Sequence, residues 1–222
     1  MNFIQNLEQD LHQKANREVA IPMENYMKNN FSFLGIKTEE RRAVFKINYE
    51  KYKTDIKANF RTITWELFNK KEREFHQVAI DLLVKELKKN YVIEDIKLIE
   101  NLIITNSWWD SVDVVAKYLL GGYLKQFSNE TYEVIERFSN SNNMWLNRSA
   151  ILFQLSYKDK TNFDLLKSEC ENHKESEEFF IQKAIGWALR DYSKFNSSGV
   201  TEYVNSTNLK PLSKREALRK IK

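Results

Sequence analysis

A motif that recurs about every 35 residues constrains this chain more than any other feature of its sequence. Three segments share an Ala-Ile pair that follows a large apolar side chain placed four residues before the alanine. One further position fills the double interval between the first two of these segments, and two more, which are weaker matches, extend the series at its ends. The successive steps are then 35, 35, 36, 34 and 34 residues. The anchors of the series are Val44, Ala79, Val114, Ala150, Ala184 and Leu218. Tandem units of this length, each a pair of helices, are typical of α-solenoids.

Composition supports the same fold class. The 222 residues include only five glycines and two prolines, where average usage gives roughly 15 and 11. All-β folds need turn residues at each hairpin, so they are disfavoured. The glycine-rich loops that cradle phosphates are absent, and so is the tetratricopeptide pattern of Trp, Leu-Gly and Tyr. We therefore predict an all-α protein with one domain over residues 1–222, an α-solenoid of about six HEAT-like repeats whose concave face is the binding surface.

The sequence gives no sign of a membrane, a disulfide or a metal. Cys170 is the one cysteine, and the three histidines are far apart in sequence, so neither a disulfide nor a zinc site is expected. The N-terminus lacks the basic and apolar regions of a signal peptide. The most apolar stretch, 98–104, is interrupted by Glu100 and Asn101. We predict a cytoplasmic protein without metal or cofactor.

Positive charge gathers at one end of the chain. Residues 208–222 hold six basic side chains and one acid, Glu216, so this segment carries +5. The whole chain carries +4, which leaves about −1 for the remainder. A basic end is typical of proteins that bind an anionic partner such as nucleic acid. Charge alone gives equal weight to a solvated helix face.

An unusual set of side chains shares one stripe of the repeat. Each position can be numbered from the anchor of its own repeat. On this numbering Trp109 is at −5, Asp113 at −1 and Trp187 at +3. Positions that differ by four residues lie along one face of a helix. Arg148 stands at −2, one turn from the −5 position, and Arg190 follows Trp187 by three residues. Taken singly, a tryptophan in a helical repeat more often lies in the hydrophobic core, and an aspartate near the start of a helix often stabilises the helix dipole. A core stripe would bury charge, so we expect these side chains on one continuous surface.

The segments that carry these residues resemble the AlkD family of bacterial DNA alkylation-repair glycosylases. The resemblance covers nearly the whole chain, and it rests on residues 26–29, 33–36, 38–42, 107–113, 145–154 and 179–187. It implies a HEAT-like solenoid that grips duplex DNA in a concave groove. A monomer suits a groove that must admit DNA, and the oligomeric state stays open. It also implies hydrolysis of the N-glycosidic bond of cationic alkylpurines, 7-methylguanine and 3-methyladenine, in base excision repair. Whether the damaged base is flipped stays open.

The resemblance also implies roles for single residues. Asp113 stands where the family has its catalytic acid, and Trp109 and Trp187 match the flanking catalytic tryptophans. The DNA-binding residues that we expect are Tyr26, Lys37, Thr38, Arg42, Arg148 and Arg190. Lys37 departs from the family pattern, which often has glutamine there, but lysine can also reach a phosphate.

The chemistry is consistent with one carboxylate. A cationic alkylpurine leaves without protonation by a general acid, unlike an ordinary glycoside. A carboxylate beside C1′ stabilises the oxocarbenium-like sugar and orients or deprotonates water. The indole faces of the tryptophans stabilise the cationic centre, and Arg148 can hold a phosphate.

Two alternative functions remain. A HEAT scaffold that binds only protein predicts exposed apolar patches and does not explain Asp113. A DNA-binding paralogue without catalysis would have lost Asp113 or a tryptophan, and all three are present.

Overall fold

The computed structural model describes residues 2–88 and 90–221, and regular structure in these residues is helical, without a β-strand. An isolated parallel bridge joins Ser32 and Glu72. The prediction of an all-α fold is confirmed. The chain divides into two compact units, residues 1–90 and 91–222. The prediction of one domain over residues 1–222 stays a prediction.

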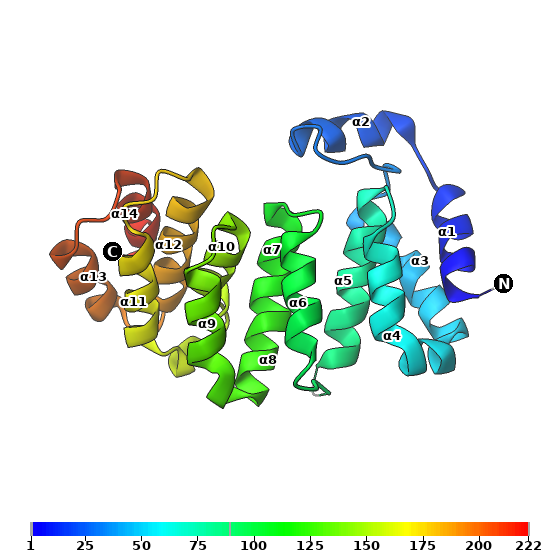
Figure 1. Ribbon diagram of the computed structural model, residues 1–222. Coiled ribbons are helices and arrows are strands. Elements are labelled where there is room, and N and C mark those ends of the chain that lie inside the picture. Colours follow the sequence, from blue (N-terminus) through cyan, green and yellow to red (C-terminus); the bar gives the residue numbers. More distant parts are fainter. Residues whose placement is uncertain (1, 89, 222) are drawn as a thin grey trace. The chain divides into compact units, whose positions relative to one another are not determined.

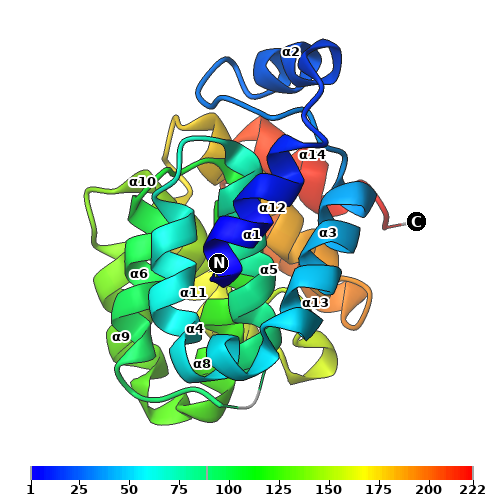
Figure 2. The ribbon, with the colours of Figure 1, turned by 90° about the vertical axis from the view of Figure 1, so that its right-hand side faces the viewer.

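The first unit contains five α-helices among its described residues. They are α1 (Phe3–His12), α2 (Arg17–Tyr26), α3 (Thr38–Lys51), α4 (Lys53–Phe68) and α5 (Arg73–Leu87). Helix α1 packs against α3 and α4, and α4 packs against α5. Helix α2 stands apart from these four in both views (Figures 1 and 2). It is held instead by the segment that leads into α3.

The second unit continues with paired helices, drawn from green to red in Figure 1. Its α-helices are α6 (Asp95–Ile104), α7 (Trp109–Val114), α8 (Gly121–Gln126), α9 (Thr131–Ser139), α10 (Met144–Leu152), α11 (Phe163–His173), α12 (Phe179–Tyr192), α13 (Ser197–Ser206) and α14 (Pro211–Leu218). A π-helical segment, η1 (Val115–Leu120), joins α7 to α8, and short 3-10 turns occupy η2 (Ser128–Glu130) and η3 (Lys158–Lys160). Among the described residues no helix is long and apolar enough to cross a membrane.

The repeat read from the sequence is present as helix pairs. The six anchors fall on α3, α5, α7, α10, α12 and α14, and from α5 onward each anchor helix follows a partner helix. Ala79, Ala150 and Ala184 are buried in the core, as their small side chains allow close approach of neighbouring helices. Val114 and Leu218 are only half-buried, and the buried positions are the adjacent Val115 and Ala217. The predicted period is therefore right, but these two anchors are misplaced by one residue.

One long helical stretch begins with the candidate catalytic residues. Residues 109–126 are helical without a break, and η1 gives this stretch one wide π turn. Where a π segment returns to α-helical hydrogen bonding, a backbone carbonyl is passed over and needs another donor. The hydroxyl of Tyr91 donates to the carbonyl of Tyr118 at 3.1 Å, and that of Tyr157 donates to the carbonyl of Gly121 at 2.6 Å. These tyrosines stabilise the wide turn that follows Asp113.

A buried carboxylate fixes the start of α3 in the first unit. Glu74 on α5 accepts the backbone N–H groups of Leu34, Gly35 and Ile36 at 3.0, 2.9 and 3.1 Å. Gly35 has a φ of +87°, and a Cβ there would lie 2.0 Å from the carbonyl oxygen of Asn16. Only glycine can therefore pass this close to the start of α2. The segment ends at residues 37 and 38, which thus take up a fixed place.

Candidate functional site

Asp113 and Arg148 form a two-pronged ion pair in the second unit. The Nε of Arg148 donates to Oδ1 of Asp113 at 2.8 Å, and its Nη2 donates to Oδ2 at 2.9 Å. The third guanidinium nitrogen, Nη1, donates to the backbone carbonyl of Phe180. Asp113 belongs to α7, Arg148 to α10 and Phe180 to α12, so the contacts link three successive repeats. We call this arrangement the Asp113–Arg148 pair.

The Asp113–Arg148 pair is more buried than the sequence suggested. The exposed fractions of the two side chains are 13% for Asp113 and 5% for Arg148. The stripe was expected to stay open because burying charge is costly, but here the opposite charges face each other and share two hydrogen bonds. Burial raises the pKa of Asp113, although the hydrogen bonds and the charge of Arg148 act in the opposite direction. The carboxylate is therefore fixed in position and only partly reached by water.

An aromatic cluster adjoins the pair. The rings of Trp108 and Trp145 lie with their centroids 5.3 and 5.1 Å from that of Phe180, and 5.8 Å from each other. The guanidinium carbon of Arg148 lies 5.8 Å from the Phe180 centroid, which joins this cluster to the ion pair. Reasoning from sequence assigned none of these three rings to the site. A signal was available, since Trp145 stands at the same −5 position of its repeat as Trp109.

The two tryptophans expected beside Asp113 are both half-buried. Trp109 is the first residue of α7, one helical turn before Asp113. Trp187 lies on α12 and packs against the core that includes Ile151 and Ala184. Their catalytic roles stay predictions.

Arg190 is engaged within the fold. Its Nη1 donates to the backbone carbonyl of Glu216 at 3.1 Å and also pairs with the carboxylate of that residue. Glu216 lies 3.0 Å from the amine of Lys183 and 3.4 Å from the guanidinium of Arg219. Glu216, the one acidic residue of the basic segment 208–222, thus forms ion pairs with cations of α12 and with one at the end of α14. Contact between Arg190 and a phosphate stays a prediction, while Lys214 and Arg215 of the basic end are exposed.

The remaining expected DNA contacts belong to the first unit. Lys37 and Thr38 are exposed at the start of α3, where free backbone N–H groups favour an anion. Arg42 is exposed one turn later and shares Asp81 with the buried Arg41, at 3.3 and 3.0 Å respectively. Tyr26 is exposed at the end of α2. The structure thus leaves all four side chains reachable from solvent.

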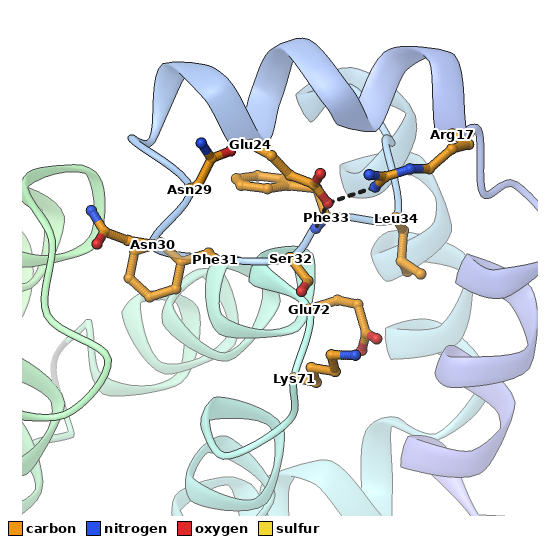
Figure 3. A pocket seen from close by; sticks show the side chains of 10 residues that line it. All are labelled: Arg17, Glu24, Asn29, Asn30, Phe31, Ser32, Phe33, Leu34, Lys71 and Glu72. Carbon is orange, nitrogen blue, oxygen red and sulfur yellow. Dashed lines mark hydrogen bonds and ion pairs between the residues drawn. The ribbon is translucent and has the colours of Figure 1, made fainter.

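A polar pocket of about 480 Å³ lies beneath α2 (Figure 3). The side chains of Arg17 and Glu24, both on α2, point toward each other on the pocket side of the helix and form an ion pair at 2.7 Å. Glu24 also accepts the N–H of Phe33 at 3.2 Å. Lys71 and Glu72 approach from the connection between α4 and α5. None of the residues expected to bind DNA lines this pocket, and its inner contacts hold α2 on the following segment.

Comparison with known proteins agrees with this fold. The family model described as DNA alkylation repair enzyme matches residues 7–221. A solved structure titled predicted DNA alkylation repair enzyme from Enterococcus faecalis is 36% identical, with a TM-score of 0.85, covering 93% of this chain and 96% of that one.

Two structures from Streptococcus mutans are more distant and support the fold alone. AlkD2 is 19% identical, with a TM-score of 0.61 and coverage of 80% of this chain and 90% of its own. The protein smu.31, from strain UA159, is 18% identical, with a TM-score of 0.60 and coverage of 83% and 98%. No curated protein matches the chain. Since the family model spans nearly all 222 residues, this chain belongs to the family of DNA alkylation repair enzymes.

Proposed function

We propose that this protein is a DNA glycosylase that hydrolyses the N-glycosidic bond of cationic alkylated purines, such as 7-methylguanine and 3-methyladenine, in duplex DNA. The observation that carries the proposal is the Asp113–Arg148 pair, a carboxylate held by two hydrogen bonds beside an aromatic cluster. Membership of the family supports a role in DNA repair and interaction with DNA. The excision of one base would begin base excision repair, and we propose that a monomer performs it.

The proposed chemistry needs little from the protein beyond a placed negative charge. Alkylation makes the purine cationic, so the bond to C1′ breaks without a proton donor, and the sugar gains positive charge. Asp113 would stabilise that charge and orient the attacking water. Arg148 fixes both carboxylate oxygens, so no side chain needs to reorganise as the bond breaks. Trp109, one turn earlier on α7, and Trp187 would offer aromatic faces to the cationic sugar.

The proposal is tested by incubating the protein with methylated duplex DNA and measuring released bases by chromatography. We expect 7-methylguanine and 3-methyladenine to be released faster than in buffer, and uracil to stay in uracil-containing DNA. Binding of the duplex without release would favour the DNA-binding paralogue that lacks catalysis. Failure to bind DNA at all would favour the protein scaffold.

Salt should weaken DNA binding steeply, because each neutralised phosphate adds roughly 0.9 to the slope of log K against log salt concentration. Arg42→Ala should reduce this slope by about one unit, since this exposed side chain is a candidate phosphate contact. Fluorescence anisotropy with a labelled duplex at several salt concentrations measures the slope. Arg137→Ala is the matched control, because Arg137 is also exposed and paired with an acid, Glu100. A flat salt response of the parent protein would contradict the DNA-binding proposal.

As the pH is lowered, the rate of excision should begin to fall at a higher pH than it would with a catalytic aspartate of ordinary pKa. Asp113 acts as a carboxylate, so protonation stops it, and burial raises its pKa above the ordinary value of about 3.9. The charge of Asp110 contributes to this rise, so Asp110→Asn should move the fall in rate to lower pH. Single-turnover rates, corrected for spontaneous base loss at each pH, measure the profile. An acidic fall at the same pH in parent and variant would contradict this electrostatic account.

A further inference from the structure

A cavity of about 560 Å³ in the second unit is not used by the proposed glycosylase reaction, and its size is typical of small-molecule sites. Its lining comes from the end of α8, η2, the start of α9, the segment after α10, η3 and the start of α11. We call it the Lys125–Lys160 pocket after the two cations that line it. Lys125 follows Asp113 by twelve residues on one helical stretch (Figure 1), roughly 18 Å along a helix. The pocket is therefore distinct from the candidate active site.

Four side chains that can donate hydrogen bonds line this pocket, those of Lys125, Ser128, Thr131 and Lys160. All four are at least partly exposed, so a ligand can reach them. The amine of Lys125 lies 4.1 Å from the centroid of the Tyr157 ring. Within residues 2–88 and 90–221 the structure gives none of the four side chains a hydrogen bond or an ion pair. Their donors are therefore available to a ligand.

The charge of the pocket selects an anion. No aspartate or glutamate is among the residues that the structure places in its lining, so two positive charges stand there without a counter-charge. Burial lowers the pKa of Lys125, and the charge of Lys160 lowers it further, as is expected when two ammonium groups are held near each other. A ligand with negative charge would relieve this repulsion.

One wall of the pocket is held in an unfavourable backbone conformation. Ser156 and Lys158 have φ of +75° and +62°, in the left-handed region that non-glycine residues rarely adopt. Between them, the hydroxyl of Tyr157 donates to the first backbone carbonyl of α8 at 2.6 Å. Gln154 exchanges hydrogen bonds of 3.1 and 2.7 Å with the backbone of the residue before α11. Strained segments that are fixed in this way are concentrated at binding sites, and this one places Tyr157 and Lys160 at the pocket.

The rest of the lining indicates what carries the charge. Tyr132, Tyr157 and Leu165 line the pocket with side chains that are exposed or half-buried, and they offer apolar surface to a flat ring. A phosphate monoester carries about −1.5 to −2 at neutral pH, which matches two ammonium groups better than a carboxylate or an internal phosphodiester does. The hydroxyls of Ser128 and Thr131 can donate to its oxygens.

We propose that the Lys125–Lys160 pocket binds a phosphate monoester of a molecule that contains a flat ring. The phosphate pairs with the two ammonium groups, and the ring lies against the apolar side chains. A free nucleotide and the phosphorylated 5′ end of a DNA strand both present this chemistry. The inference does not depend on the glycosylase proposal, because neither Asp113 nor any of the expected DNA contacts lines the pocket.

Titration of the full chain with phenyl phosphate tests the proposal, followed by calorimetry and by chemical-shift changes of the backbone amides of Ser128 and Thr131. We expect millimolar or tighter binding that shifts both amides. Methyl phenyl phosphate, which carries one charge, and inorganic phosphate, which lacks the ring, should each bind about tenfold more weakly. Phenol, which lacks the phosphate, should not bind.

Lys160→Gln should weaken the binding of phenyl phosphate by about tenfold, the effect of losing a charged hydrogen-bond donor. Lys158→Gln is the matched control, because Lys158 is exposed on the same 3-10 turn and lies outside the lining. It should bind phenyl phosphate as the parent does. Equal weakening by the two substitutions would show attraction by the general positive charge of the turn, and it would overturn the proposal.

Two further ligands separate the sources of the phosphate. Tighter binding of thymidine 5′-monophosphate than of a 5′-phosphorylated oligonucleotide would support a free nucleotide. Tighter binding of the oligonucleotide, with shifts of the Ser128 and Thr131 amides that its 5′-hydroxyl form does not cause, would support a strand end. Absence of phenyl phosphate binding to the parent protein would overturn the proposal, as would equal binding of phenol or binding that leaves both amides unshifted. These results are read without excision, so they are independent of the glycosylase assay.

Discussion

Asp113→Asn should slow excision of 7-methylguanine by about 10² or more, the scale of losing one placed electrostatic group in an active site. The substitution keeps the shape of the side chain but removes the charge that would oppose the cationic sugar. Because this charge develops in the transition state, affinity for duplex DNA should stay within a few-fold of the parent. Single-turnover release from methylated duplex DNA measures the rate, and anisotropy measures the affinity.

Asp113→Asn should also lower the stability of the folded protein. The amide oxygen of the new asparagine can still accept one hydrogen bond from the buried Arg148 but no longer balances its charge, so we expect a loss of about 1–3 kcal/mol in the free energy of unfolding. Rates must therefore be measured well below the melting temperature of the variant. Asp159→Asn, which removes the same charge from an exposed 3-10 turn, is the control and should change neither rate nor stability. Release at the parental rate by Asp113→Asn would overturn the assignment of Asp113.

Arg148→Ala should lower the free energy of unfolding by about 3–5 kcal/mol, the cost of leaving one member of a buried ion pair alone. The substitution removes both hydrogen bonds to Asp113 and the one to the carbonyl of Phe180. It therefore loosens the contact between α7, α10 and α12 together. Urea denaturation followed by circular dichroism measures the loss.

Two comparisons make this prediction specific. Arg137→Ala, an exposed arginine paired with Glu100, should cost less than about 1 kcal/mol, as surface pairs do. In the background of Arg148→Ala, Asp113→Asn should cost less than it does alone, because the two side chains share one interaction. A loss from Arg148→Ala no larger than that from Arg137→Ala would mean that the ion pair does not hold these helices together.

The helical architecture could be predicted from the sequence alone. Apolar anchors every 34–36 residues, with few glycines and prolines, require pairs of helices that bury one face against their neighbours. The helices fall where this period places them, and from α5 onward the second helix of each pair carries the anchor. Local period and composition are enough for this because, within each unit, helices pack chiefly against helices close to them in the sequence. The stripe also placed Asp113 and Arg148 on adjacent repeats, and they are in contact.

The partner of each charged side chain could not be predicted from the sequence, because it depends on how the helices pack. Nothing in the sequence distinguishes Arg148, which is locked to Asp113 and to a backbone carbonyl, from Arg42, which stays exposed. The engagement of Arg190 by Glu216 was equally hidden. The sequence repeat predicts on which face of its helix a residue lies. A hydrogen bond between repeats depends instead on the distance and angle between atoms of different helices. Those distances are set by how the helices pack, and so the partners of the charged side chains are known only once the chain has folded.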